Sequence, residues 1–504
     1  MKPWLILGTI AVLIAVVPVD HRQSADPLHP EEERFGHQVV LEQARRLAAT
    51  PYDPRRLSSE SPLRQLTHDQ YNDIDVDSEQ GIWRRERVPF RVELLPAGFV
   101  YETPVAVNIV ENGVARKVSA TPEMFSFGEQ VRHLSSRPLP ISGFRVRARL
   151  DGSEEWAPLL VFQGASYFRA AGRGAPLGLS ARGLAIRTAH PTGEAFPAFT
   201  HFWIERPAAN AVGIVIHSLL DSPSTTGAYL FRIIPGPETV MDISLTLFPR
   251  EPLDAVGIAP LNAMFLFNRT NRAVIDDYRD AVHDAEGLQI VTASGEQIWR
   301  PLANPSRLQV SSFTSTAPRG FGLVQRTRQA EAFQDLKAAY HRRPSTWIEP
   351  LGDWGAGSVE LIEIPSDSES NNNIIALWRP AEAIAAGAPW QAAYRLRWTS
   401  TPRVAQSVGR VVATRTGATP DGDQRAFVVD FDAATPSADS LRMQATSSAG
   451  TLSRQALQFN PTTGGVRASF VFDPEGADLA ELRLVLLQGE MPVSETWLYR
   501  WTAP

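Results

Sequence analysis

The chain has 504 residues, of which 43% are hydrophobic and 21% charged, a balance typical of globular proteins that excludes an intrinsically disordered chain. The formal net charge is −6 and no basic block dominates, so we expect no nucleic-acid partner. The absence of cysteine excludes disulfides, thiolate metal sites and a cysteine nucleophile.

The N-terminus predicts a secretory signal peptide over residues 1–25. Lys2 precedes an apolar run over residues 3–19, which is shorter than the roughly 20 residues of a membrane-spanning helix. Because only Ser24 and Ala25 offer small residues for cleavage, an uncleaved membrane anchor stays open as the alternative.

Residues 35–49 predict the first helix. Val40, Ala44 and Leu47 recur at helical spacing, and Pro51 ends the pattern. We therefore expect one apolar side of this helix to pack against the protein.

Alternation of apolar and polar residues then predicts strands. Residues 90–95 and 144–152 alternate cleanly, and residues 104–120 predict a hairpin around Asn112 and Gly113, a pair typical of type I′ turns. The arginines of 144–152 are expected on a solvated strand face, with an anionic-ligand face as the alternative.

A second helix is predicted over residues 328–343. Phe333, Leu336 and Tyr340 recur on one side of this stretch, and Pro344 stops it.

Strands dominate the remainder and predict an all-β fold in two parts. Residues 33–378 are expected to form a large β-rich domain, and the Ala/Gly/Pro-rich residues 379–390 a linker. Residues 391–504 are expected to form a small immunoglobulin-like sandwich that begins with the alternating strand 394–398.

Residues 162–231 are dense in glycine, aromatic, arginine and acidic residues. Aromatic rings stack on the apolar faces of sugars, while carboxylates and guanidinium groups bind hydroxyls, so the composition suits a sugar site. The alternative is that these rings belong to the core of a sheet.

Glycoside hydrolysis usually needs two carboxyl groups. The candidates are His283, Asp284 and Glu286 in one segment, Asp353 in a second, and Asp367 and Glu369 in a third. Other chemistries lack their motifs, since there is no GxSxG elbow, no HExxH and no P-loop. The ten histidines show no metal-ligand spacing, so we expect neither a metal nor another cofactor.

A series of long motifs resembles the periplasmic glucan biosynthesis proteins G and D of Gram-negative bacteria. The motifs include "FQGASYFRA", "GLSARGLAI", "FPAFTHFWIERP", "LLDSPSTTGAYLF", "HDAEGL", "PRGFGLVQR" and "DWGAGSVELIEIP", in the family's order. The likeness runs from about Phe35 to the linker and is weaker after it.

The resemblance implies a large galactose-mutarotase-like β-sandwich followed by an immunoglobulin-like sandwich, located in the periplasm. It also implies a part in osmoregulated periplasmic glucan biosynthesis, acting on a β-1,2-linked glucose backbone by inverting hydrolysis or transglycosylation. The implied partners are β-1,2-glucan chains and the inner-membrane glucan synthesis machinery. Oligomeric state stays open.

The resemblance further implies site residues. The family's base-side aspartate falls on Asp284, and its acid-side loop of Glu-x-x-Asp-Asn falls on Glu369 to Asn373, which puts Asn372 where an aspartate is expected. An amide has no titratable proton and cannot act as a general acid. The base-side loop departs as well, at Ala285 and Glu286, and Asn262-Ala263 replaces a Thr-Ser pair. Within the matching motifs, the expected sugar contacts are Tyr167, Arg169, Arg182, Asp221, His283, Trp299, Arg300, Arg326 and Trp354.

Three hypotheses follow. The first is a β-1,2-glucan hydrolase or transglycosylase in which Glu369 or Asp367 replaces the missing acid. The second is a glucan-binding protein of the same pathway that has lost turnover, and the third, sugar-ring epimerisation, rests on fold analogy alone. From the sequence we favour the enzyme, because Asp284 and Glu369 are present.

Overall fold

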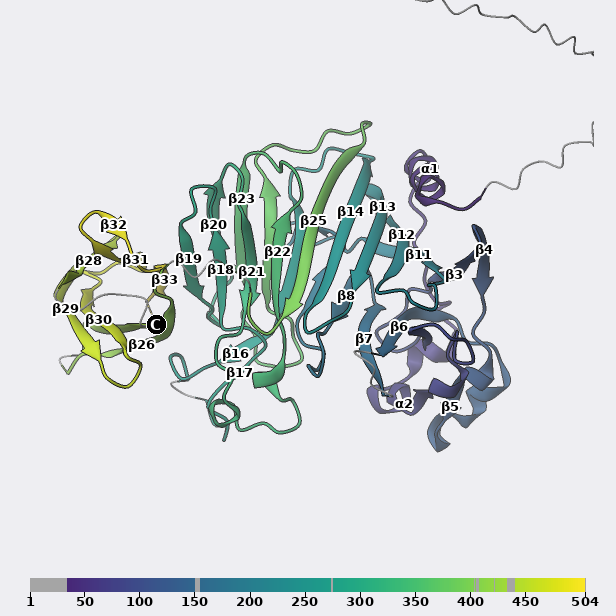
Figure 1. The fold of residues 1–504 in the computed structure, drawn as a ribbon, viewed down its shortest axis with the longest axis horizontal. Coiled ribbons are helices and arrows are strands. Elements are labelled where there is room, and N and C mark those ends of the chain that lie inside the picture. Colours follow the sequence, from purple (N-terminus) through teal and green to yellow (C-terminus); the bar gives the residue numbers. More distant parts are fainter. Residues whose placement is uncertain are drawn as a thin grey trace, which may run out of the picture. The chain divides into compact units, whose positions relative to one another are not determined.

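The computed structural model describes residues 34–149, 155–272, 275–402, 404, 408–420, 422–432 and 440–503. The predicted signal peptide lies outside the described residues. Strands dominate the described chain, which confirms the all-β prediction (Figure 1).

The first large sheet has ten strands. In spatial order they are β2 (Phe90–Pro96), β6 (Ile141–Arg149), β7 (Trp156–Gln163), β8 (Tyr167–Ala170), β9 (Ser180–Arg182), β15 (Val256–Ala263), β24 (Ile374–Pro380), β23 (Gly357–Glu363) and β20 (Gln309–Ser315), with β10 (Ala185–Ile186) paired to β15.

The second large sheet has fifteen strands. In spatial order they are β28 (Arg442–Ser447), β31 (Leu479–Gln488), β33 (Thr496–Thr502), β19 (Gln297–Pro301), β18 (Gly287–Val291), β21 (Gly320–Val324), β22 (Ser345–Pro350), β25 (Trp390–Thr399), β14 (Thr239–Pro249), β13 (Thr225–Ile234), β12 (Ile214–Asp221), β11 (Ala198–Glu205), β3 (Ala106–Glu111) and β4 (Val114–Val118), with β32 (Met491–Pro492) paired to β31.

Three smaller sheets and short helices complete the fold. The sheets are β26 (Val411–Ala418), β27 (Arg425–Phe431), β30 (Gly465–Asp473) and β29 (Thr451–Asn460); β1 (Ile74–Val76) and β5 (Phe125–Phe127); and β16 (Phe265–Phe267) and β17 (Val282–His283). The helices are α1 (His37–Ala48), α2 (His68–Asn72) and the 3₁₀ turns Pro62–Gln65, Ser78–Gln80, Pro122–Met124, Glu129–Ser136, Ala330–Ala332 and Tyr340–Arg342.

The two large sheets pack face to face around one aromatic core. Phe162 and Phe168 of the ten-stranded sheet contact Phe231 of the fifteen-stranded sheet, with ring centres 5.1 and 5.5 Å apart. All three rings are buried, so this face supplies much of the apolar burial that holds the sandwich. A second core lies between β26, β27 and β30 and the strands β31 and β33, where Phe427 and Phe470 meet Trp497.

The first predicted helix is confirmed as α1. Val40 and Ala44 are buried against β12 and β13. Figure 1 shows α1 beside these strands. Its C-terminal turn is anchored by Thr226 Oγ1, which donates to the Ala44 carbonyl over 2.7 Å.

The predicted hairpin is confirmed as β3 and β4. Strands are also confirmed within the other two predicted stretches, as β2 and β6. Asn112 and Gly113 both have positive φ, at 53° and 81°, which is the conformation that a type I′ turn requires. The arginines of β6 lie on its more exposed face, where Arg149 is exposed and Arg145 and Arg147 are half-buried. On this face Arg145 pairs with the buried Glu93 over 2.6 Å, and Arg147 donates to the Trp156 carbonyl.

The helix predicted over residues 328–343 is wrong. This segment holds only two short 3₁₀ turns, and Gln334 and Ala339 between them adopt positive φ, which interrupts a helix. Phe333 and Tyr340 are buried in a local cluster, but Leu336 is 93% exposed. Tertiary contacts of the individual side chains therefore override the helical pattern.

The strand predicted to open the C-terminal sandwich belongs to the large one. β25 lies between β22 and β14, and Tyr394, Leu396 and Trp398 are buried in the main core. That prediction is wrong because alternation shows that a stretch is a strand but not which sheet receives it. Residues 381–389, within the predicted linker, connect β24 of one large sheet to β25 of the other.

Candidate functional site

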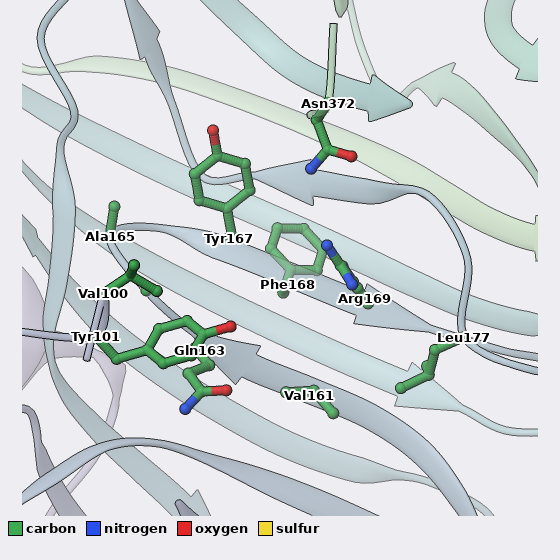
Figure 2. Close-up of a pocket in the computed structure, with 11 residues that line it drawn as sticks. Val100, Tyr101, Val161, Gln163, Ala165, Tyr167, Phe168, Arg169, Leu177 and Asn372 are labelled. Atoms are coloured by element: carbon green, nitrogen blue, oxygen red, sulfur yellow. The ribbon is translucent and has the colours of Figure 1, made fainter. Parts of the chain in front are cut away.

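A cavity of about 470 Å³ lies on the outer face of the ten-stranded sheet. β8 alternates, so that Phe168 points into the core while Tyr167 and Arg169 point outward into the cavity. The whole lining consists of Val100, Tyr101, Val161, Gln163, Gly164, Ala165, Tyr167, Phe168, Arg169, Leu177 and Asn372 (Figure 2).

Hydrogen bonds from Gln163 of β7 connect the cavity lining to α2 and to β6. Gln163 donates to Tyr71 over 2.9 Å and to Ser142 over 3.0 Å, and Tyr71 in turn donates to the Pro96 carbonyl. Burial raises the pKa of Tyr167, and the same cause raises that of Tyr71 to about 12, so both phenols stay neutral hydrogen-bonding groups at physiological pH.

Asn372 enters the cavity from the loop that follows β23. Figure 2 shows its amide directed toward the side of the cavity where Tyr167 and Arg169 lie. The next residue, Asn373, is buried and holds the loop in place. Its Oδ1 accepts from the Phe265 amide over 2.9 Å, and its Nδ2 donates to the Phe265 and Ile364 carbonyls over 3.0 Å each.

Alternate serines stabilise the same loop. Ser366 Oγ accepts from the Ser368 amide, and Ser368 Oγ accepts from the Ser370 amide, over 3.3 and 3.2 Å. Hydroxyls that bind backbone two residues on favour a turn over regular structure. The Ser-x-Ser-x-Ser pattern therefore fixes the loop, while Asp367 and Glu369 between the serines are exposed.

Asp284 is buried directly after β17. Its Oδ2 accepts from the Met264 amide over 3.4 Å, and its Oδ1 pairs with Arg343. Because Met264 and Phe265 are consecutive, adjacent peptide groups hold Asp284 and Asn373. The backbone at the start of β16 thus brings Asp284 and Asn373 close together.

Glu369 is connected to Asp284 through the side chains of Tyr340 and Arg343. Tyr340 donates to Glu369 Oε2 over 3.2 Å, and the guanidinium carbon of Arg343 lies 4.3 Å from the centre of the Tyr340 ring. The same carboxylate oxygen pairs with Arg279 over 2.8 Å, and Arg279 also pairs with Asp277 and Asp335. Glu369 does not line the cavity.

The sequence from residue 35 to residue 501 matches the family described as periplasmic glucan biosynthesis protein, MdoG. The chain belongs to this family. A glucans biosynthesis protein G of Vibrio cholerae is 43% identical over 474 residues, which are 93% of this chain and 87% of that protein. A protein of the same name from Shewanella frigidimarina is 43% identical over 477 residues, covering 93% and 85%, and one from Shewanella sp. strain ANA-3 is 42% identical over 493 residues, covering 95% and 90%.

Some expected sugar contacts of this MdoG-family chain are engaged in internal contacts. Trp299 is buried, and the guanidinium carbon of Arg326 lies 3.5 Å from the centre of the Trp299 ring. Arg300 is also buried and pairs with Glu363 over 3.2 Å. Trp354 donates to the Ala393 carbonyl over 3.0 Å. These four residues do not line the cavity that holds Asn372.

Three further expected contacts lie elsewhere. His283 is 2% exposed, between Phe265 and Phe333, and burial lowers its pKa. Arg182 is buried beside Tyr167. Asp221 lines a different cavity, of about 440 Å³ near the C-terminal end of α1, where it pairs with Arg250 over 2.8 Å and burial raises its pKa.

One further candidate carboxylate and several lining residues lie outside the expected sugar contacts described so far. Asp353 is exposed and accepts from the Gly355 amide in a turn. Sequence reasoning missed Tyr101, Gln163 and Leu177 as lining residues, because they come from three separate segments that only the tertiary fold brings together. The one available signal was Gln163, which lies within a quoted motif.

Neither a metal site nor a membrane span is found in the described part of the chain. Over those residues, no group of three or more His, Asp or Glu side chains is arranged to hold a metal ion. Likewise, none of the described helices is long and apolar enough to cross a membrane.

Proposed function

We propose that this chain works in the periplasm as a β-1,2-glucan-binding protein of osmoregulated periplasmic glucan biosynthesis, with little or no hydrolytic turnover. The observation that carries the proposal is the position of Asn372, which lines the cavity beside Tyr167 and Arg169. The resemblance puts the proton donor at this residue, and an amide cannot donate a proton to a leaving group.

The cavity suits a neutral sugar chain. Tyr101 and Tyr167 offer rings and hydroxyls, while Gln163, Arg169 and Asn372 offer polar groups that bind hydroxyls. Because asparagine is nearly isosteric with aspartate, these contacts survive the replacement. Turnover does not, since the loss of general acid catalysis typically costs about 10²–10⁴-fold in rate.

The second candidate is inverting hydrolysis or transglycosylation with Glu369 as the acid. In that reaction Glu369 would give its proton to the glycosidic oxygen as the bond to the anomeric carbon breaks. Asp284 would take a proton from the attacking water or sugar hydroxyl. What favours this candidate is the contact chain from Glu369 through Tyr340 and Arg343 to Asp284. Against it, Glu369 Oε2 already accepts from two donors and lies outside the cavity lining.

The two candidate functions can be tested with linear β-1,2-glucan as the ligand and substrate. Four proteins are compared, namely the natural chain, Asn372→Asp, Asn371→Asp and Glu369→Gln. Calorimetry measures binding, and chain length and anomeric form measure turnover. We expect the natural chain to bind without turnover, and Asn372→Asp to gain turnover of about 10²–10⁴-fold over it. Asn371→Asp is the matched control, because Asn371 is exposed and donates to Ser366 instead of lining the cavity.

The outcomes separate the candidates. Turnover by the natural chain that disappears in Glu369→Gln would establish the second candidate and remove the first. An absence of glucan binding in all four proteins would contradict both. Contact with the inner-membrane glucan synthesis machinery stays a prediction from the resemblance.

A further inference from the structure

We propose that Phe196 is a stacking platform for a glucosyl unit next to those held in the Asn372 cavity, and that Arg182 fixes the platform in place. This inference rests on the proposed function, since it names how the same surface holds a longer glucan chain. Phe196 is 54% exposed and lies outside the cavity lining.

The cavity and Phe196 are connected through Arg182. Tyr167 of β8 and Arg182 of β9 are direct cross-strand partners. The guanidinium carbon of Arg182 lies 5.2 Å from the centre of the Tyr167 ring and 5.8 Å from the centre of the Phe196 ring. Both rings therefore lie within 6 Å of the same cation, one lining the cavity and the other exposed beyond it.

Arg182 is itself fixed. Its side chain is 3% exposed, its Nε donates to Asn262 Oδ1 over 2.9 Å, and its Nη1 pairs with Glu194 over 2.5 Å. Glu194 also accepts from Thr188 over 2.6 Å, which ties down the loop that carries Phe196 two residues later. Arg182 thus acts as a positioning residue instead of the direct sugar contact expected from the sequence.

Exposure alone does not single out Phe196, because scattered exposed apolar side chains are normal. Its distinction is that hydrogen bonds and cation–π contacts hold an exposed ring beside the cavity. An ordered aromatic ring loses little entropy when a ligand covers it. The adjacent charges of Arg182 and Glu194 pair with each other, which suits a neutral ligand such as unsubstituted glucan.

A length series of linear β-1,2-glucan oligomers tests the platform. The affinity of each oligomer is measured by calorimetry for the natural chain, Phe196→Ala, Phe196→Trp and Val212→Ala. Val212 is the matched control, because it is 78% exposed on the loop between β11 and β12. We expect Phe196→Ala to bind short oligomers as the natural chain does and long oligomers about tenfold more weakly.

Phe196→Trp keeps a flat ring and adds a reporter. We expect it to retain long-oligomer affinity, and its fluorescence relative to the natural chain to shift to the blue with long oligomers but not with short ones. Equal affinity of Phe196→Ala and the natural chain at every length would overturn the platform and leave the proposed function intact. An equal loss at every length would also overturn it, since that result means a distorted cavity. No binding by the natural chain at any length would overturn both proposals.

Discussion

At the scale of single residues, three consecutive asparagines serve three different purposes. Asn371 is exposed and bonds to its own loop, Asn372 lines the cavity, and Asn373 is 2% exposed with its amide bound to backbone on both sides. The same type of side chain therefore acts as a turn residue, a candidate ligand contact and an internal support, depending on its burial and on the groups around it.

Asn373→Ala is expected to destabilise the fold. The change leaves the Phe265 amide without its partner in a buried position, which costs about 1–3 kcal/mol. Urea unfolding followed by circular dichroism measures the loss. Asn371→Ala is the control and is expected to change the free energy of unfolding by about 0.5 kcal/mol or less. Equal losses in the two variants would contradict the assignment of Asn373 as an internal support.

At the scale of elements, α1 is held at its N-terminal end by a histidine pair. His37 Nδ1 and His217 Nδ1 lie 3.2 Å apart, and His217 Nε2 binds Glu205 over 2.7 Å. Burial, followed by the neighbouring His217 and Arg232, lowers the pKa of His37 to about 4. Since one nitrogen of the pair must accept the shared hydrogen, the contact requires that at least one ring be neutral.

The docking of α1 is therefore expected to weaken in acid. An unfolded histidine has a pKa near 6.5, so between pH 6.5 and 4 the unfolded state binds more protons than the folded state. The contribution of His37 is complete above about pH 6.5 and is lost as the pH falls toward 4. Urea midpoints across this range should depend less on pH in His37→Gln than in the natural chain. A substitution of the exposed His190 to Gln serves as the control, and an unchanged slope in His37→Gln would rule out the contribution.

Local pattern was enough to predict some elements and not others. α1 and the β3–β4 hairpin follow from spacing and from the Asn112-Gly113 pair, because neighbours in sequence fix both. The segment 328–343 has a helical pattern as well, but its ion pairs and buried rings belong to partners far along the chain. Alternation could not tell which sheet β25 joins.

The residues of the candidate site also fall into those that the sequence could identify and those that it could not. The resemblance led to Asp284 and Asn372, and in the structure the consecutive amides of Met264 and Phe265 bind Asp284 and Asn373, the residue next to Asn372. Sequence reasoning could not separate Arg169, which points into the cavity, from the buried Arg300. Both residues lie in aromatic-rich motifs, and only the register of each strand decides which way a side chain points.

At the scale of the whole molecule, the fifteen-stranded sheet is continuous from the large sandwich to the C-terminal strands. β19 pairs with β33 in parallel through Ile298–Thr496 and Trp299–Trp497. Beside this junction, Arg326 binds both oxygens of Glu495, which is fully buried and also accepts from the Val411 amide.

Arg326→Met is expected to destabilise the fold by about 3–5 kcal/mol, because it leaves Glu495 buried without its countercharge. The double variant Arg326→Met/Glu495→Gln should recover part of the loss, since it removes the charge and keeps an acceptor. Urea unfolding gives both values, and glucan affinity is measured in parallel. Loss of affinity without loss of stability would instead support Arg326 as the sugar contact expected from the sequence.

The placement of β25 also has a consequence for how the chain reaches its folded state. β22 and β14 meet only through β25, so the centre of the larger sheet stays open until residues 390–399 have been made. A chain that ends before β25 leaves β22 and β14 without the strand that pairs with both, and unpaired strand edges invite pairing with other chains. The large sandwich therefore closes late in synthesis or after it. Fragments that end before residue 390 should aggregate, whereas a chain extended past Thr399 gains the strand that seals the core.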